Sequence, residues 1–148
     1  MNKMFFAAAM IVASIASVAP ASAAMQIATG TQHFPPHSGR TPISAIPPAC
    51  RGFSQSFQSP IASGLVVLEQ SVSFAQPVRN AVAVITGWDV EFSNSDDHHF
   101  GRQIVAVGIV GETGGTQLNV CIAYGLRDFS GDWDDKFEGN IRFAVLGE

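Results

Sequence analysis

Hydrophobic and polar residues alternate along the C-terminal part of the chain in short runs, and turn residues separate these runs. In Trp88-Asp89-Val90-Glu91-Phe92, the three hydrophobic side chains fall on one face of an extended chain and the two acids on the other. This pattern predicts a half-buried strand with Trp88 in the core. Further strands are predicted over residues 65–68, 72–74, 81–86, 103–110, 118–126 and 140–146.

The last two predicted strands also assign residues to faces. The predicted inward residues are Leu118, Val120, Ile122, Tyr124, Ile141, Phe143 and Val145. No window after residue 24 shows the i, i+3, i+4, i+7 spacing of an amphipathic helix. The fold class we predict is therefore all-β, a single antiparallel β-sandwich of about six to eight strands.

The N-terminus has the three parts of a secretory signal peptide. Lys3 precedes an apolar run from Met4 to Val18, and small residues follow Pro20 up to Ala24. We therefore expect residues 1–24 to be a signal peptide that exports the protein to the periplasm or the extracellular space. No later apolar run reaches the length of a membrane span, so we expect no transmembrane segment in the mature form.

A proline-rich segment follows this leader. Six of the eight prolines lie there: Pro35, Pro36, Pro42, Pro47, Pro48 and Pro60. Proline cannot donate a backbone hydrogen bond to a β-ladder or a helix interior. We therefore predict an irregular, extended Pro/Ser-rich arm over residues 25–62, ahead of a sandwich domain over residues 63–148.

The two cysteines, Cys50 and Cys121, are an even pair in a chain with an export signal. Such a pair predicts a disulfide. The bond would tie the arm to a core strand, and chain entropy alone would give it roughly 4 kcal/mol of stabilisation.

Charge and motifs exclude several functions. Eight basic residues against twelve acids give a net charge of −4, which is wrong for a nucleic-acid partner. The chain has no Gly-x-Ser-x-Gly elbow, no His-Glu-x-x-His helix and no phosphate-binding glycine loop, so we expect no enzyme.

The loop over residues 128–139 carries candidate calcium ligands. Asp128, Ser130, Asp132 and Asp134 place oxygen-bearing side chains at alternate positions, and Ca²⁺ binds six to eight oxygens. The alternative is a solvated acidic turn, because Gly139 stands where a calcium loop would have its bidentate glutamate.

A second polar loop, residues 93–102, contains Asp96, Asp97, His98 and His99. Adjacent histidines on an extended chain point to opposite faces, so zinc would need ligands from elsewhere. The alternatives are a hydrogen-bonded polar loop and the recognition of sugar hydroxyls.

Trp133 stands between two acids, Asp132 and Asp134. An exposed indole beside carboxylates can stack on a sugar ring while the acids accept hydroxyl hydrogens. Arg127 and His99 would complete this predicted ligand site. The alternative is that Trp133 packs back onto the end of the sandwich.

The stretch from Val72 to Leu146 resembles the H-type lectin-like secreted β-sandwiches. The resemblance is carried by the run Val72-Ser73-Phe74-Ala75-Gln76-Pro77-Val78, by the strand from Ala81 to Trp88, and by the late acidic loop before an alternating terminal strand. It implies a six-stranded sandwich, frequently trimeric, that binds N-acetylgalactosamine-type sugars. The loop beginning Asp128-Phe129-Ser130 departs from that family, so no sugar-binding residue is carried over.

Two hypotheses follow for the function. The first is an exported, non-enzymatic, lectin-like module that binds a glycan through its end loops, with Ca²⁺ as a candidate cofactor. The second is a structural or protein-interaction protein of the cell envelope with no small-molecule site. Assembly into a homo-oligomer is open under either hypothesis, and a metal-dependent hydrolase is a third alternative.

Overall fold

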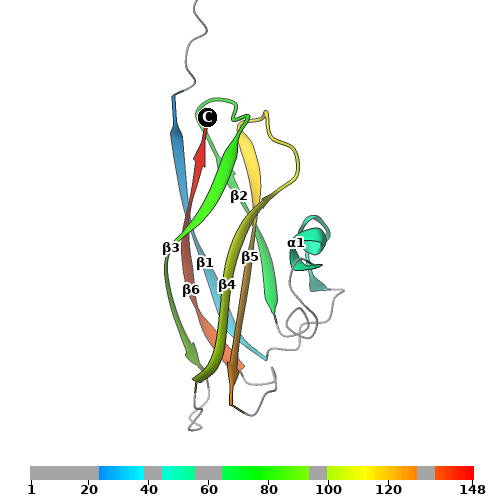
Figure 1. The fold of residues 1–148 in the computed structure, drawn as a ribbon, viewed down its shortest axis with the longest axis vertical. Helices are drawn as coiled ribbons and strands as arrows, with labels where there is room; N and C mark the ends of the chain where they lie inside the picture. The colour runs from blue at the N-terminus through cyan, green and yellow to red at the C-terminus, as the bar shows by residue number, and fades with distance from the viewer. Residues whose placement is uncertain (1–23, 39–44, 56–64, 94–99, 130–135) are drawn as a thin grey trace, which may run out of the picture.

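Figure 1 shows the computed structural model, which describes residues 24–38, 45–55, 65–93, 100–129 and 136–148. Most of the described chain is strand, and two short helical turns precede the second strand. The strands are β1 (Gln26–Ser38), β2 (Val66–Ser73), β3 (Ala81–Phe92), β4 (Phe100–Val110), β5 (Gln117–Asp128) and β6 (Lys136–Gly147). The helical turns are η2 (Pro48–Cys50) and α1 (Arg51–Gln55).

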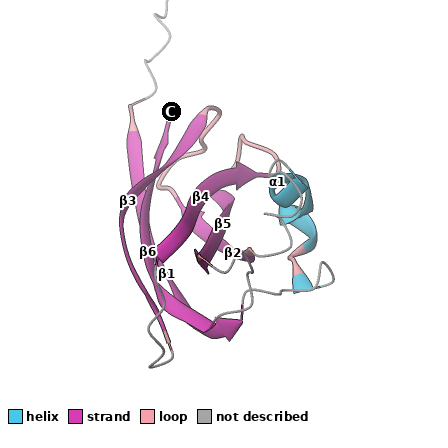
Figure 2. Cartoon of the chain, turned by 60° about the horizontal axis from the view of Figure 1, so that its bottom comes forward, coloured by secondary structure: helices cyan, strands magenta, loops and turns pink. Residues whose placement is uncertain are grey.

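The strands form two three-stranded antiparallel sheets that pack face to face (Figures 1 and 2). The first sheet has the order β1-β6-β3 and the second has the order β2-β5-β4. The predicted all-β antiparallel sandwich is confirmed, and its six strands lie within the expected range. Because β3 and β4 are both edge strands, one side of the sandwich is bounded by these two strands.

The core lies between the sheets and is built from the predicted inward residues of β5 and β6. All seven of these residues are buried: Leu118, Val120, Ile122, Tyr124, Ile141, Phe143 and Val145. Aromatic rings fill the middle of this core. The ring of Tyr124 lies 5.7 Å from that of Phe34 and 4.9 Å, edge to face, from that of Phe137.

The first part of the proline-rich segment is a strand, so the prediction of an irregular arm was wrong for residues 26–38. Strand β1 pairs with β6 along its whole length, and its residue Phe34 is buried in the core. Pro35 and Pro36 fall where the register shifts between Phe34 and His37. Because β1 is an edge strand and the shift interrupts its ladder, the two prolines cost few hydrogen bonds.

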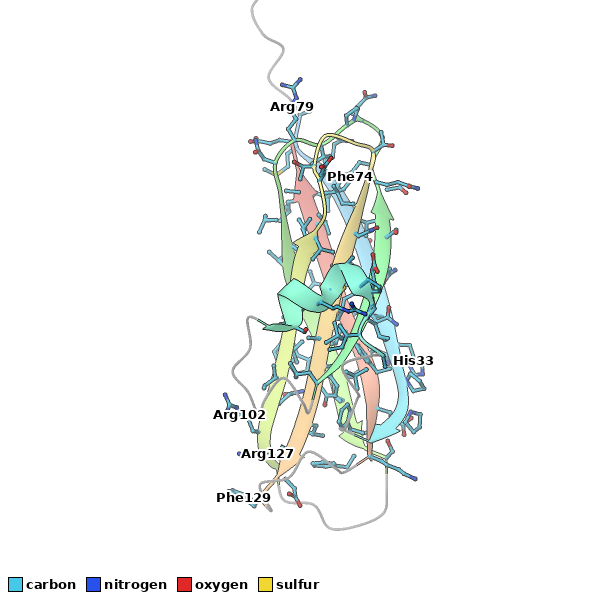
Figure 3. All side chains as sticks on the ribbon, turned by 90° about the vertical axis from the view of Figure 1, so that its right-hand side faces the viewer. His33, Phe74, Arg79, Arg102, Arg127 and Phe129 are labelled. Atoms are coloured by element: carbon cyan, nitrogen blue, oxygen red, sulfur yellow. A yellow bond between two sulfur atoms is a disulfide. The ribbon has the colours of Figure 1, made fainter. Side chains whose placement is uncertain are left out.

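The remainder of the described arm, residues 45–55, lies against the outer face of the second sheet (Figures 2 and 3). Ile46 and Cys50 pack there on Leu65, Val67 and other apolar side chains. We call residues 45–55 the cap.

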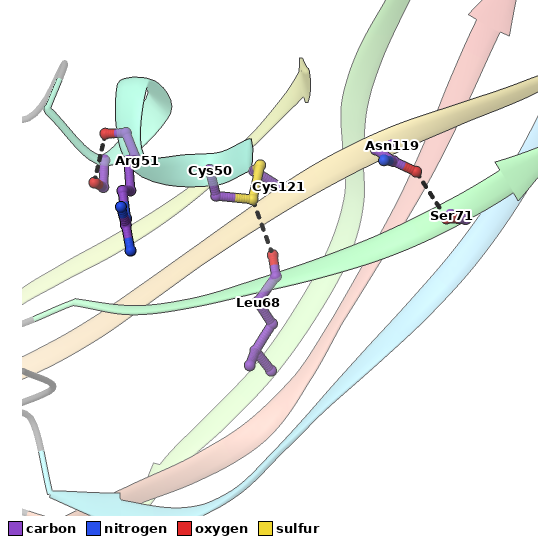
Figure 4. Close-up of a disulfide and its surroundings, with 7 residues drawn as sticks. Cys50, Arg51, Leu68, Ser71, Asn119 and Cys121 are labelled. Atoms are coloured by element: carbon purple, nitrogen blue, oxygen red, sulfur yellow. Dashed lines mark hydrogen bonds between the residues drawn. A yellow bond between two sulfur atoms is a disulfide. The ribbon is translucent and has the colours of Figure 1, made fainter. Parts of the chain in front are cut away.

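The predicted disulfide between Cys50 and Cys121 is confirmed (Figure 4). Both cysteines are fully buried, and their Cα atoms are 5.6 Å apart. The bond joins the cap to β5, the central strand of the second sheet. The expected link between the proline-rich segment and a core strand therefore exists.

The predicted signal peptide lies outside the described residues, apart from Ala24. In the described part of the chain, no helix has both the length and the apolar composition needed to cross a membrane.

Candidate functional site

Most of the predicted loop site lies outside the described residues. This holds for His99, Ser130, Asp132, Trp133 and Asp134. The calcium, zinc and loop-sugar hypotheses therefore stay predictions.

Two predicted residues are described, and both lie at the end of β5. Arg127 and Asp128 are partly buried there, and Figure 3 shows Arg127 at the same end of the sandwich as Arg102 and Phe129. Arg127 stands directly opposite Arg102 of β4 in the ladder. Both Arg127 and Asp128 have interaction partners.

The structure has a different candidate site, an open groove of about 660 Å³ beside β3. All three strands of the first sheet contribute to it, and β4 of the second sheet adds Gln103. We call it the edge groove. It is lined by His33, Trp88, Asp89, Val90, Glu91, Gln103, Glu138, Gly139 and Asn140.

One cross-strand row of neighbouring residues in the edge groove spans all three strands, and we call it the histidine row. Asn140 of β6 pairs with His33 of β1 on one side and with Asp89 of β3 on the other. The Nδ1 atom of His33 lies 3.0 Å from the Oδ1 atom of Asn140. A carboxamide oxygen only accepts, so Nδ1–H of His33 is the donor when this contact is a hydrogen bond.

The next cross-strand row on this face is acidic, and we call it the acidic row. Glu91 of β3 and Glu138 of β6 are directly opposite each other, so their side chains share a face. Asp89 lies two residues along β3 and therefore on the same face. Within the described residues, no arginine or lysine forms an ion pair with these three carboxylates. Like charges placed opposite each other destabilise a sheet, so the Glu91–Glu138 pair is unfavourable by itself.

Trp88 also lines the edge groove, and 52% of its surface is exposed. The prediction that it lies in the core was wrong. Trp88 stays in unbroken register with Val90 and Phe92 and pairs with Ile141, but β3 is an edge strand, so no neighbouring strand covers the large indole on the open side of the sandwich. Val90 and Phe92, predicted for the same face, do pack against the core.

Gly139 lets β6 and β3 approach closely in the middle of the edge groove. A Cβ atom at this position would clash with the carbonyl oxygen of Asp89 and would lie 2.8 Å from the Cα atom of Val90. Only glycine fits this approach, which sets the spacing between the acidic row and the histidine row.

Tyr124 is buried in the core, and the Gln103 side chain lies near its hydroxyl without meeting the geometry of a hydrogen bond within the described residues. Burial raises the pKa of this hydroxyl well above its usual value, and the Gln103 side chain lowers it by a smaller amount. Since Gln103 also lines the edge groove, the groove and the aromatic core share one polar side chain.

The sequence reasoning missed the edge groove because it looked for chemistry in loops. The groove is built from strands, and His33 lies in the segment that was expected to be irregular. The signal that could have found it was the placement of Asp89 and Glu91 on one strand face, opposite an acid of the last strand.

No protein-family model matches the chain, and no curated protein or solved structure matches it either. The fold and groove therefore define the class: a six-stranded antiparallel sandwich with an acidic, tryptophan-lined groove at an edge strand.

Proposed function

We propose that the protein is an exported, non-enzymatic binding module that recognises carbohydrate in the edge groove. The observation that carries this proposal is the half-exposed indole of Trp88 in a groove whose other side chains are mostly hydrogen-bonding groups. A sugar ring presents an apolar face that stacks on an indole and hydroxyls that carboxylates and amides can bind.

Three further features support the proposal. The groove volume of about 660 Å³ falls in the ordinary range for small-ligand sites. The two three-stranded sheets agree with the six-stranded sandwich that the lectin-like resemblance implies. The disulfide is compatible with export, since such bonds persist in oxidising compartments.

The test is glycan binding by Trp88→Ala beside Trp133→Ala. We expect Trp88→Ala to weaken binding by at least about tenfold, because stacking and burial of an indole contribute more than about 1.4 kcal/mol. Trp133→Ala, the matched control, removes the other tryptophan and should leave the affinity within about twofold. The measurement is a glycan array followed by calorimetry on the strongest ligand.

The reverse result would return the site to the loop predicted around Trp133. Thermal melts of both variants check that each remains folded. If the unmodified protein bound no glycan on the array, the carbohydrate proposal would fall.

A second candidate function is a protein-interaction protein of the cell envelope, and one observation favours it. On the outer face of the first sheet, Ile27, Val82 and Val84 are 65%, 54% and 37% exposed and lie in adjacent rows of the ladder. Contiguous exposed apolar side chains are typical of surfaces that contact another protein. If the unmodified protein bound no glycan on the array, this protein-interaction function would be the better supported of the two.

A further inference from the structure

We infer that the edge groove selects sugars that carry free amino groups, as in oligomers of glucosamine, over neutral, N-acetylated and acidic sugars. This inference rests on the proposed carbohydrate-binding function and names its ligand class. The first observation is electrostatic: Asp89, Glu91 and Glu138 line the groove, and no lysine or arginine of the described residues does. An anionic sugar would be repelled there, and an ammonium group would be attracted.

The register adds a second observation about the same carboxylates. Glu91 and Glu138 are direct cross-strand partners, an arrangement that is unfavourable when both are ionised. A cation bound between them offsets this repulsion, an interaction that no lysine or arginine of the described residues provides.

A third observation concerns the wall of the groove. Gln103 lines this wall from β4 of the second sheet. Its carboxamide can both donate to and accept from the hydroxyls of a sugar.

A metal ion fits the carboxylates less well than an organic cation does. Among the described residues, no group of three or more His, Cys, Asp or Glu side chains could hold a metal ion. A Ca²⁺ ion takes six to eight oxygen ligands at about 2.3–2.6 Å, whereas the three carboxylates of the groove are spread over two strands. Carboxylates spread along a strand suit a ligand with several separate ammonium groups.

Trp88 favours a sugar over a lysine-rich peptide. Apart from Trp88, Val90 and Gly139, every side chain of the groove has a hydrogen-bonding group, so the groove offers little apolar surface to a lysine stem. A sugar amine brings the ammonium together with a ring face for the indole and hydroxyls for His33 and Asn140.

The test is calorimetry at about pH 6, where amines are protonated and ordinary carboxyls are ionised. The ligands are the β-1,4-linked tetramers of glucosamine, N-acetylglucosamine and glucose, with tetragalacturonate as the anion. We expect the glucosamine tetramer to bind about tenfold more tightly than the glucose tetramer, and tetragalacturonate more weakly than either.

Glu91→Gln and Glu138→Gln should each reduce this preference to within about threefold and leave the glucose tetramer unaffected. Glu112→Gln is the matched control, because Glu112 is an exposed loop residue that does not line the groove. It should preserve the preference. Both groove variants should melt at or above the temperature of the unmodified protein, since each removes a like-charge pair, so loss of the preference cannot be unfolding.

The two proposals fail differently. Equal affinity for the amine and neutral tetramers would overturn the selectivity and leave carbohydrate binding intact. No binding of any tetramer, nor of any glycan on the array, would overturn the proposed function itself. Competition by tetralysine as strong as by the glucosamine tetramer would mean that the groove recognises charge alone, and would overturn the assignment to sugars.

Discussion

Tyr124 is the only tyrosine of the chain, and its hydroxyl is buried without a hydrogen-bond partner in the described structure. Burial raises its pKa in the folded state, whereas the unfolded chain deprotonates near the ordinary value of about 10. Above that pH the unfolded state has lost a proton that the folded state keeps, so stability falls as pH rises. We expect the free energy of unfolding to drop by up to about 1.4 kcal/mol per pH unit there.

The measurement is urea denaturation between about pH 9 and pH 11, with phenolate absorbance reporting ionisation. Tyr124→Phe should flatten this pH dependence, because it removes the titrating group and keeps the ring contacts with Phe34 and Phe137. At neutral pH we expect the variant to be as stable as the unmodified protein or about 1 kcal/mol more stable. A phenol that ionises at its ordinary pH in the folded protein would contradict this account.

At the residue scale, the sequence predicted the core better than the site. Positions such as Ile122 and Phe143 were predictable because strict alternation in a central strand leaves one face only for the core. Trp88 was not, because its exposure follows from the edge position of β3, and which strands lie at an edge depends on pairing partners that the sequence does not show. The edge groove was hidden for the same reason: Glu91 and Glu138 are far apart in the sequence, and only the register brings them together.

At the element scale, the cap depends on the disulfide. It is short, and its fixed contacts are the apolar packing of Ile46 and Phe53 and the bond from Cys50 to Cys121. Replacing both cysteines with alanine should lower the free energy of unfolding by roughly 4 kcal/mol, because the bond closes a loop across a sequence separation of 71 residues. Urea denaturation measures the loss.

Reduction of the unmodified protein under mild denaturant should reproduce this loss, which separates the bond from the effect of the substitutions. Released from its tether, the cap would uncover Leu65, Val67 and Ala123, so binding of a hydrophobic dye should rise. A loss below about 1 kcal/mol would show that packing alone holds the cap in place.

Strand β1 shows why element prediction failed at the N-terminus. Its inward residues include Ala28, Gly30 and Gln32, which give no hydrophobic alternation, and Pro35 and Pro36 argue against any strand. Two circumstances that a sequence does not reveal make the strand stable: an edge position, and a partner, β6, whose inner face is strongly apolar. Gly30 is required, since the Phe143 ring occupies the space of a side chain there.

At the scale of the whole molecule, the sandwich includes β1, so a chain that lacks this strand should not fold. We compare a chain that begins at residue 24 with one that begins at residue 39. The shorter chain keeps Cys50 and the cap and removes β1 alone. It loses the entire ladder with β6 and the buried side chain of Phe34.

Loss of a buried phenylalanine alone costs about 3–5 kcal/mol, against a total stability of about 5–15 kcal/mol for an ordinary domain. Removal of β1 also exposes Phe137, Ile141 and Phe143 and leaves one long edge of β6 unpaired. We therefore expect a cooperative thermal transition for the chain from residue 24 and none for the chain from residue 39, measured by calorimetry. Equal melting temperatures for the two chains would show that the sandwich folds without β1. The predicted start of the sandwich domain at residue 63 would then hold. In that case the fold would not need His33, and His33 would serve the edge groove only as a contact for the ligand.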